Sequence, residues 1–186
     1  MAEVKRTLSA LVEDKPGVLN RVSSLIRRRG FNIMSIAVGR SEIPGFSRMI
    51  IVVDGSTTAV DQVRKQLCKI IRVVKVIDIS EENIVSRELA LIKVKSTPQT
   101  QSEIIQIATE VFRAHIVDIN PESITVEVTG DEDKVHSLIE LFRGFGIIEL
   151  VRTGLIAVTR GNIGPIRRQE KEQSEDRNRS KVESNN

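Results

Sequence analysis

The sequence is poor in several residue types, and each shortage argues against a class of protein. It has one cysteine, which rules out an internal disulfide and favours a reducing compartment. Tryptophan and tyrosine are absent and only five phenylalanines occur, so few rings are available to stack on the bases of RNA. No apolar run approaches the ~20 residues that cross a membrane, and residues 1–10 lack the apolar centre of a secretory signal. We therefore expect a protein that is not secreted and has neither a membrane nor a nucleic acid as partner.

The charge and the reactive side chains of the chain indicate no further kind of partner or site. The formal net charge is +3, and so small an excess of bases gives no argument for a polyanion partner. His115 and His136 lie far apart without a Cys–His spacing, so we expect no metal site. Cys68 falls within an apolar helical pattern, where a buried, unreactive thiol is the expected role. No nucleophile and base stand in a recognisable arrangement, so the sequence predicts no catalytic centre.

The hydrophobic pattern occurs twice. Residues 1–80 predict the order strand, helix, strand, strand, helix, strand, and residues 81–162 repeat it. In the first copy the strands are expected at 7–12, 33–39, 47–53 and 73–79, and the helices at 18–28 and 60–71. In the second copy the strands are expected at 88–95, 115–119, 123–129 and 147–159, and the helices at 104–112 and 135–142.

This order predicts an α+β protein with two ferredoxin-like (βαββαβ) domains in tandem. Each domain would be an antiparallel sheet with two helices on one face. The other face of each sheet needs a cover, and a second copy or a second chain is the expected one. Residues 163–186 are predicted to be a disordered charged tail, because residues 167–186 are rich in charge and have Val182 as their only aliphatic residue.

The segment from Leu11 to Val38 is the most informative part of the chain. Pro16 fits the first turn of a helix, and Gly17 lets a ligand approach the backbone where helix N–H groups point outward. A small carboxylate suits such a corner. With Asp14 before the turn and Asn32 at the head of the next strand, the corner could also hold an ammonium group, as an amino-acid sensor would. On residue types alone, a simple capping turn explains the corner equally well.

The ordered series of motifs resembles the small, regulatory subunits of acetolactate synthase, also called acetohydroxyacid synthase. The resemblance spans about residues 3 to 161 and rests on five segments. These are LVEDKPGVLNR (11–21), RGFNI (29–33), SRM (47–49), RELAL (87–91) and VRTGLIAVTRG (151–161). It implies an ACT domain in residues 1–80, for effector binding and dimerisation. It also implies a second ferredoxin-like domain in residues 81–162, for partner contact and signal transmission.

For function, the resemblance implies a regulatory subunit without an active site of its own. Such a subunit binds the large, thiamine-diphosphate-dependent subunit, raises its activity and makes it sensitive to valine. Thiamine diphosphate, FAD and magnesium would then reside on the large subunit only. Carried over position by position, valine would lie between the ACT domains of a homodimer. The implied effector residues are Asp14, Gly17, Val18 and Leu19 of one chain and Asn32 and Ile33 of its neighbour.

Several alternatives remain open at this point. A branched apolar pocket distinguishes side chains that differ by one methylene by only about 1–3 kcal/mol, so leucine and isoleucine are further candidate effectors. Another tandem ACT sensor, such as a regulator of glycine metabolism, is the nearest rival, although the second copy has no acid-x-Pro-Gly corner in its loop 96–100. A ferredoxin-like RNA-binding module and a small acyl-phosphate hydrolase are disfavoured by the missing aromatics and the missing anion loop. The expected location is a bacterial cytoplasm or a plastid stroma.

Overall fold

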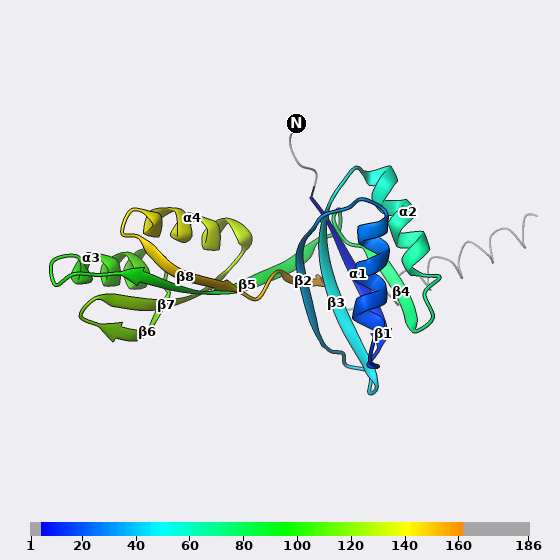
Figure 1. Cartoon of the computed structure of the whole chain (residues 1–186), viewed down its shortest axis with the longest axis horizontal. Helices are drawn as coiled ribbons and strands as arrows, with labels where there is room; N and C mark the ends of the chain where they lie inside the picture. Colours follow the sequence, from blue (N-terminus) through cyan, green and yellow to red (C-terminus); the bar gives the residue numbers. More distant parts are fainter. Residues whose placement is uncertain (1–4, 162–186) are drawn as a thin grey trace, which may run out of the picture. The chain divides into compact units, whose positions relative to one another are not determined.

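The computed structural model describes residues 5–161, apart from the side chains of residues 57 and 58. The predicted disordered tail lies outside the described residues. The described chain forms two compact units, which are treated one at a time below (Figure 1). Of the described residues, 5–85 and 157–161 form the first unit, and 86–156 form the second.

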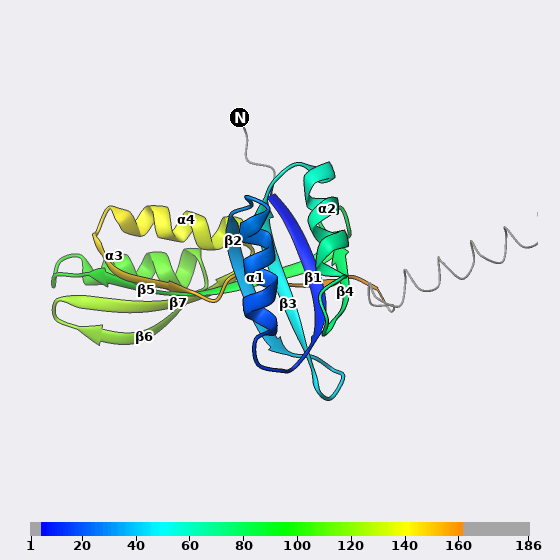
Figure 2. The ribbon, with the colours of Figure 1, turned by 45° about the vertical axis from the view of Figure 1, so that its right-hand side comes forward.

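The first unit is a four-stranded antiparallel sheet with two helices on one face (Figures 1 and 2). Its strand order is β2-β3-β1-β4, which is that of a ferredoxin-like fold and confirms the predicted class. The elements are β1 (Lys5–Glu13), α1 (Val18–Arg28), β2 (Ile33–Arg40), β3 (Phe46–Asp54), α2 (Thr57–Leu67) and β4 (Val73–Asp78).

Two periodicities in the sequence place side chains in the core between this sheet and its helices. On β1, residues 8–12 are all buried, but only the alternate residues Leu8, Ala10 and Val12 belong to this core, as the period of two in a strand requires. On α1, Val18, Val22 and Ile26 recur at helical spacing and are also buried. The polar residues between them on α1 are left on the opposite face of the helix, which becomes important for the candidate site.

The second unit repeats the arrangement with the strand order β6-β7-β5-β8. Figure 2 shows α3 and α4 on the same side of this sheet. The elements are β5 (Ile84–Lys95), α3 (Gln101–Gln106), β6 (His115–Asn120), β7 (Ser123–Gly130), α4 (Glu132–Arg143) and β8 (Ile147–Arg152). The helix predicted at 104–112 is realised in two parts, because α3 continues into a π-helical turn at Ile107–Val111.

The end of the chain differs from the predicted strand at 147–159. That strand is broken at residues 153–155, and a separate strand β9 (Ile156–Thr159) pairs with β5. Ala157 is buried with Ile50, Ile77 and Ile79, which lie on the face of the first sheet that the helices leave open. Residues 157–161 therefore group with the first unit. The chain itself therefore covers part of that open face.

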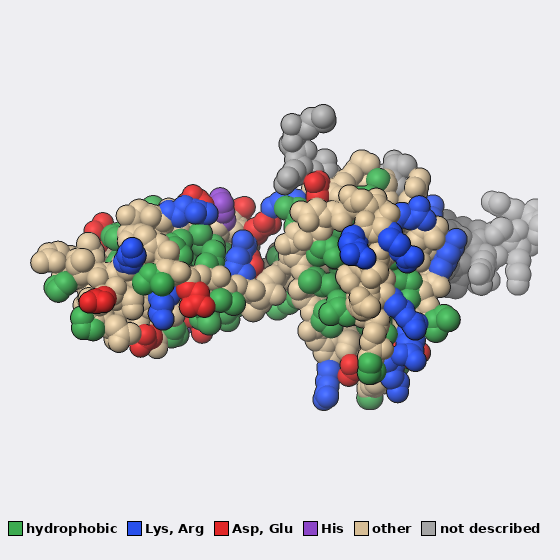
Figure 3. All heavy atoms as spheres, in the orientation of Figure 1, with side chains coloured by type: hydrophobic (Ala, Val, Ile, Leu, Met, Phe, Trp, Pro, Cys, Tyr) green, Lys and Arg blue, Asp and Glu red, His purple; other side chains and the backbone are tan. Residues whose placement is uncertain are grey.

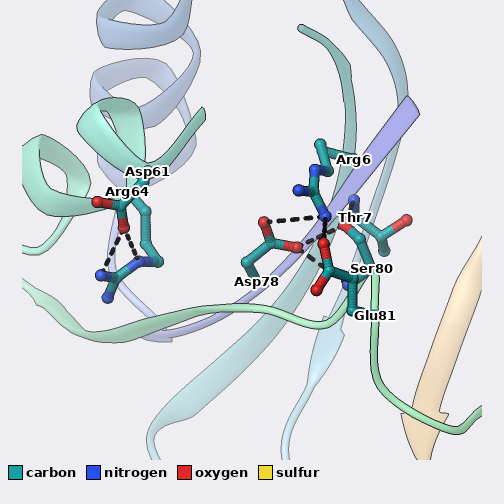
Figure 4. Close-up of polar contacts among 7 residues, drawn as sticks. All are labelled: Arg6, Thr7, Asp61, Arg64, Asp78, Ser80 and Glu81. Atoms are coloured by element: carbon teal, nitrogen blue, oxygen red, sulfur yellow. Dashed lines mark hydrogen bonds and ion pairs between the residues drawn. The ribbon is translucent and has the colours of Figure 1, made fainter. Parts of the chain in front are cut away.

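A polar cluster marks the end of β4 (Figure 4). The Arg6 side chain is almost buried, and its Nη1 lies 2.9 Å from Glu81 Oε1 and 4.0 Å from Asp78 Oδ2. The Ser80 hydroxyl donates to Asp78 and accepts from the Thr7 N–H at 2.8 Å. The two carboxylates compensate the charge of the buried Arg6 guanidinium, and the Ser80 hydrogen bonds tie the segment after β4 to β1.

Two features of α2 complete the description of the first unit. Asp61 accepts hydrogen bonds from the side chains of Lys65 and Arg64, both at 2.7 Å, and these bonds hold the pKa of the Asp61 carboxyl below its usual value (Figure 4). Cys68 is exposed, so the expectation that it is buried was wrong. The reason is its position, since α2 ends at Leu67 and Cys68 caps the helix outside the buried stripe.

Candidate functional site

The predicted effector corner is the connection between β1 and α1, and Gly17 determines its shape. Gly17 has φ +84°, in the left-handed region that glycine adopts most readily, and it is the N-cap of α1. Because such a residue is not helical, α1 can begin only at Val18. Pro16 therefore precedes the N-cap, and the prediction that it occupies the first helical turn was wrong. A Cβ at Gly17 would meet no atom within 4 Å, so the surface here is open.

Backbone N–H groups line this opening. The first hydrogen bond of α1 runs from the Arg21 N–H to the Gly17 carbonyl, at 3.1 Å. The N–H groups of Leu19 and Asn20 thus have no acceptor earlier in the helix, and Gly17 has no side chain to cap them. The side chain of Val18 is buried in the core, so Val18 contributes only backbone to the opening. An anion with two oxygens suits such a set of donors at the positive end of a helix.

Asp14 lies beside these donors and is held by the neighbouring hairpin. Its N–H donates to the Gly45 carbonyl at 2.9 Å. Its half-exposed carboxylate has Oδ2 at 3.8 Å from Nε of Arg40, a side chain that is 91% exposed. A cation that approached this end of the sheet would therefore find a carboxylate whose present partner is loosely held and well solvated.

Asn32 and Ile33 lie at the opposite end of the same sheet. Ile33 is level with Val53 and Arg6, whereas Glu13, next to Asp14, is level with Phe46. Along β1 this separation amounts to roughly 23 Å at about 3.3 Å per residue. Asp14 and Asn32 of one chain therefore cannot share one corner, and that sequence-based interpretation was wrong. Only residues of two different chains could bring them together.

Asn32 and Ile33 instead border a hollow beside α1. The residues that line it with them are Asn20, Ser23, Ser24, Arg27 and Phe31. The sequence analysis did not identify this arrangement. A signal was present, because Asn20, Ser23, Ser24 and Arg27 follow the i, i+3, i+4, i+7 spacing that places residues on one side of a helix. The hollow offers amide, hydroxyl and guanidinium groups next to the exposed strand β2.

Comparisons with known proteins agree with this geometry. A family model described as the small subunit of acetolactate synthase matches residues 87–161, and one described as an AHAS small subunit-like ACT domain matches residues 8–75. The probable acetolactate synthase small subunit of Archaeoglobus fulgidus is 53% identical over 159 residues, 86% of this chain and 99% of the relative. The chain belongs to the acetolactate synthase small-subunit family. Both predicted corner segments fall within the ACT match.

Other relatives support the same assignment. The acetolactate synthase small subunit of Mycobacterium bovis is 48% identical over 164 residues, 88% of this chain and 97% of that protein. Among solved structures, the acetolactate synthase small subunit of Thermotoga maritima superposes with a TM-score of 0.77 at 42% identity, covering 86% of this chain and 99% of that chain. Membership of this family makes the chain a partner of the large catalytic subunit.

Two of the segments that carried the resemblance meet in the second unit. Arg152 of β8 donates to Glu88 of β5, with Nε at 2.8 Å from Oε1, and Glu88 is only 4% exposed. The Glu88 hydrogen bonds raise the pKa of Arg152 above its usual value. Next to this pair, Thr153 and Leu89 exchange hydrogen bonds that continue the β5–β8 pairing. The motif residues Glu88 and Arg152 thus have a structural role, as an ion pair whose carboxylate is nearly buried.

Other kinds of site find little support among residues 5–161. No three His, Cys, Asp or Glu side chains of the described chain are grouped as metal ligands would be. None of the helices described is long and apolar enough to cross a membrane. Figure 3 shows Lys and Arg side chains on the face of the first unit formed by α1 and α2. The aromatic residue of its central strands β1 and β3 is Phe46, at the first position of β3.

Proposed function

We propose that this chain is a non-catalytic regulatory subunit that activates the thiamine-diphosphate-dependent large subunit of acetolactate synthase and confers feedback inhibition by valine. Membership of the small-subunit family carries the first part of this proposal. The open, glycine-shaped corner beside Asp14 supports the second part, because it offers donors for a carboxylate next to an acceptor for an ammonium group. A free amino acid is a ligand that carries both.

The proposed valine site is completed by a second copy of the chain, through strand β2. This strand is an edge of its sheet, and Met34 and Val38 on it are 38% and 47% exposed. An edge strand with exposed apolar residues favours pairing with another strand. If two β2 strands paired antiparallel about their midpoint, Ile33 of one would lie opposite Arg40 of the other. Arg40 adjoins Asp14, so this pairing would bring Asn32 and Ile33 of one chain to the corner of its neighbour.

In this arrangement each end of valine has a defined partner. The carboxylate would accept from the N–H groups of Leu19 and Asn20, where the helix dipole also favours an anion. The ammonium would lie between Asp14 and the neighbouring chain's Asn32. The isopropyl group would contact Ile33 of that neighbour. Since the ligand touches both chains, it would stabilise one dimer geometry relative to another, and inhibition would follow from that difference.

The remaining parts of the proposal concern what the chain itself does not do. We propose that it has no active site, and that thiamine diphosphate, FAD and magnesium are bound by the large subunit alone. The complex would work in a bacterial cytoplasm or a plastid stroma. A glycine-metabolism regulator and an RNA-binding module have less support, because the chain belongs to the small-subunit family and its central strands carry few aromatic residues.

Reconstitution tests this function directly. The chain should co-purify with a large catalytic subunit and increase its rate of acetolactate formation, and valine should then lower that rate. Sedimentation equilibrium of the chain alone should give the mass of a dimer. The large subunit alone, with and without valine, is the control. A chain that neither binds the large subunit nor alters its rate would contradict the proposal, and a monomer at all concentrations would contradict the two-chain site.

A further inference from the structure

We infer that Arg72, which lies 55 residues after the Gly17 corner in the sequence, is a positioning residue for the effector loop. This inference rests on the proposed function, because it assigns a regulatory role to a residue outside the corner itself. Arg72 lies in the turn between α2 and β4, and none of the segments that carried the family resemblance includes it.

The first observation is that Arg72 contacts the loop at two points. Its carbonyl accepts from the Glu13 N–H at 2.8 Å, where β1 ends. Its guanidinium Nη1 donates to the Pro16 carbonyl at 3.3 Å, next to Gly17. The residues between these two contacts include Asp14, so the backbone and the side chain of Arg72 together hold both ends of the segment that carries the proposed ammonium acceptor. The Arg72 side chain is 37% exposed, and it lies on the surface of the corner and not in the core.

The second observation is the backbone conformation of Arg72. Its φ is +79°, in the left-handed region that costs every residue except glycine conformational energy. Glycine would therefore adopt this backbone conformation at a lower conformational energy than arginine does. The long Nε–Oε2 distance of 4.0 Å to Glu13 adds little stability, because exposed ion pairs are weak. Stability of the fold thus gives no reason for an arginine here, whereas the contact with the Pro16 carbonyl does.

The contact between Arg72 and Pro16 restrains the loop that joins β1 to α1. A donor on the Pro16 carbonyl restrains the peptide between Pro16 and Gly17, and thereby the direction of the N–H groups that follow it at the start of α1. Without that restraint the loop would sample more conformations, and a ligand would have to order it on binding. Arg72 also places a positive charge near the site of a bound carboxylate. Both effects favour the ligand-bound state.

Replacement by glycine separates this role from a structural one. In Arg72→Gly the side-chain contact with Pro16 is lost while the left-handed backbone is relieved. We expect the midpoint of thermal unfolding of the full chain to stay constant or rise, and valine binding measured by calorimetry to weaken about five- to tenfold. In the reconstituted complex, the valine concentration that gives half-inhibition should rise by the same factor.

Arg113 provides the matched control, because it also has a positive φ, of +50°, and lies in the second unit. Arg113→Gly should leave valine binding unchanged. Arg72→Lys, which retains a cationic donor, should recover part of the affinity. Unchanged valine binding in Arg72→Gly would overturn the inference, and so would a lowered unfolding midpoint that accompanies weaker binding. Failure of the proposed function would look different, since the unmodified chain would then not bind valine at all.

Discussion

Replacing Gly17 separates the two properties that make the corner a candidate valine site, its backbone conformation and its lack of negative charge. Nothing lies within 4 Å of a Cβ at this position, so Gly17→Asn and Gly17→Asp should both fit without a clash. Each forces a non-glycine residue to φ +84°, at about 1 kcal/mol or less, because Asn and Asp tolerate this region better than other residues do. The two variants have the same shape and differ in one charge.

The magnitude of the charge effect follows from Coulomb's law. A carboxylate at position 17 would lie about 5 Å from a ligand carboxylate bound on the first-turn N–H groups of α1. At an effective dielectric constant between about 20 and 80, the repulsion is about 1–3 kcal/mol. We therefore expect Gly17→Asp to bind valine roughly five- to 150-fold more weakly than Gly17→Asn does. The difference should shrink at high salt, because the corner is exposed.

Calorimetric titration of both full-length variants with valine, at low and high salt, is the appropriate assay. Thermal unfolding of the same samples checks that the two variants are equally folded. The reasoning would be refuted if Gly17→Asp and Gly17→Asn bound valine with equal affinity. A second refutation would be a Gly17→Asp variant that loses valine sensitivity only because it no longer associates with the large subunit.

Three further predictions concern stability and need only urea or thermal unfolding. Gly55→Ala should destabilise the first unit by about 1–3 kcal/mol, because its Cβ would clash with Cε1 of Phe31 and displace that ring. Arg152→Met should destabilise the second unit by about 2 kcal/mol, since it leaves the nearly buried Glu88 carboxylate unpaired, although Arg152 itself is partly solvated. Asp61→Asn should lower stability near neutral pH, and its deficit should vanish as the pH falls below the lowered pKa of Asp61, under the usual 3.8.

Each of these predictions has a control. Gly39→Ala should be tolerated, because no atom lies within 4 Å of its Cβ and its φ is not positive. The double variant Glu88→Leu with Arg152→Met should recover stability, because no buried charge remains; equal loss in the double variant would contradict the ion-pair argument. For Asp61 the direction of the pH dependence is the test, because its carboxyl stabilises the fold only while it is ionised. If the loss of stability in Asp61→Asn grew at acid pH, hydrogen bonding to the ionised carboxylate would not be the cause of the lowered pKa.

The sequence predicted the elements of this protein well because their signals are local. The period of two on β1 and the helical spacing of Val18, Val22 and Ile26 each follow from the geometry of one segment. The prediction that Cys68 is buried was wrong for the same reason. A local apolar pattern does not reveal that the helix ends one residue before it. At the corner, Gly17 was recognised, but the positions of Pro16 and of the helix start depend on a left-handed φ that residue types only suggest.

By itself, the sequence determined the tandem α+β class and the family and offered the candidate residues of the proposed effector corner, because these depend on residue identity and spacing. The tertiary structure alone decided which of those residues can meet. Antiparallel register places Asp14 and Asn32 at opposite ends of one sheet, and it brings Arg72 onto a loop that precedes it by more than fifty residues. It also returns Ala157 to the first unit. Such contacts arise from strand pairing between distant segments, which no local pattern encodes.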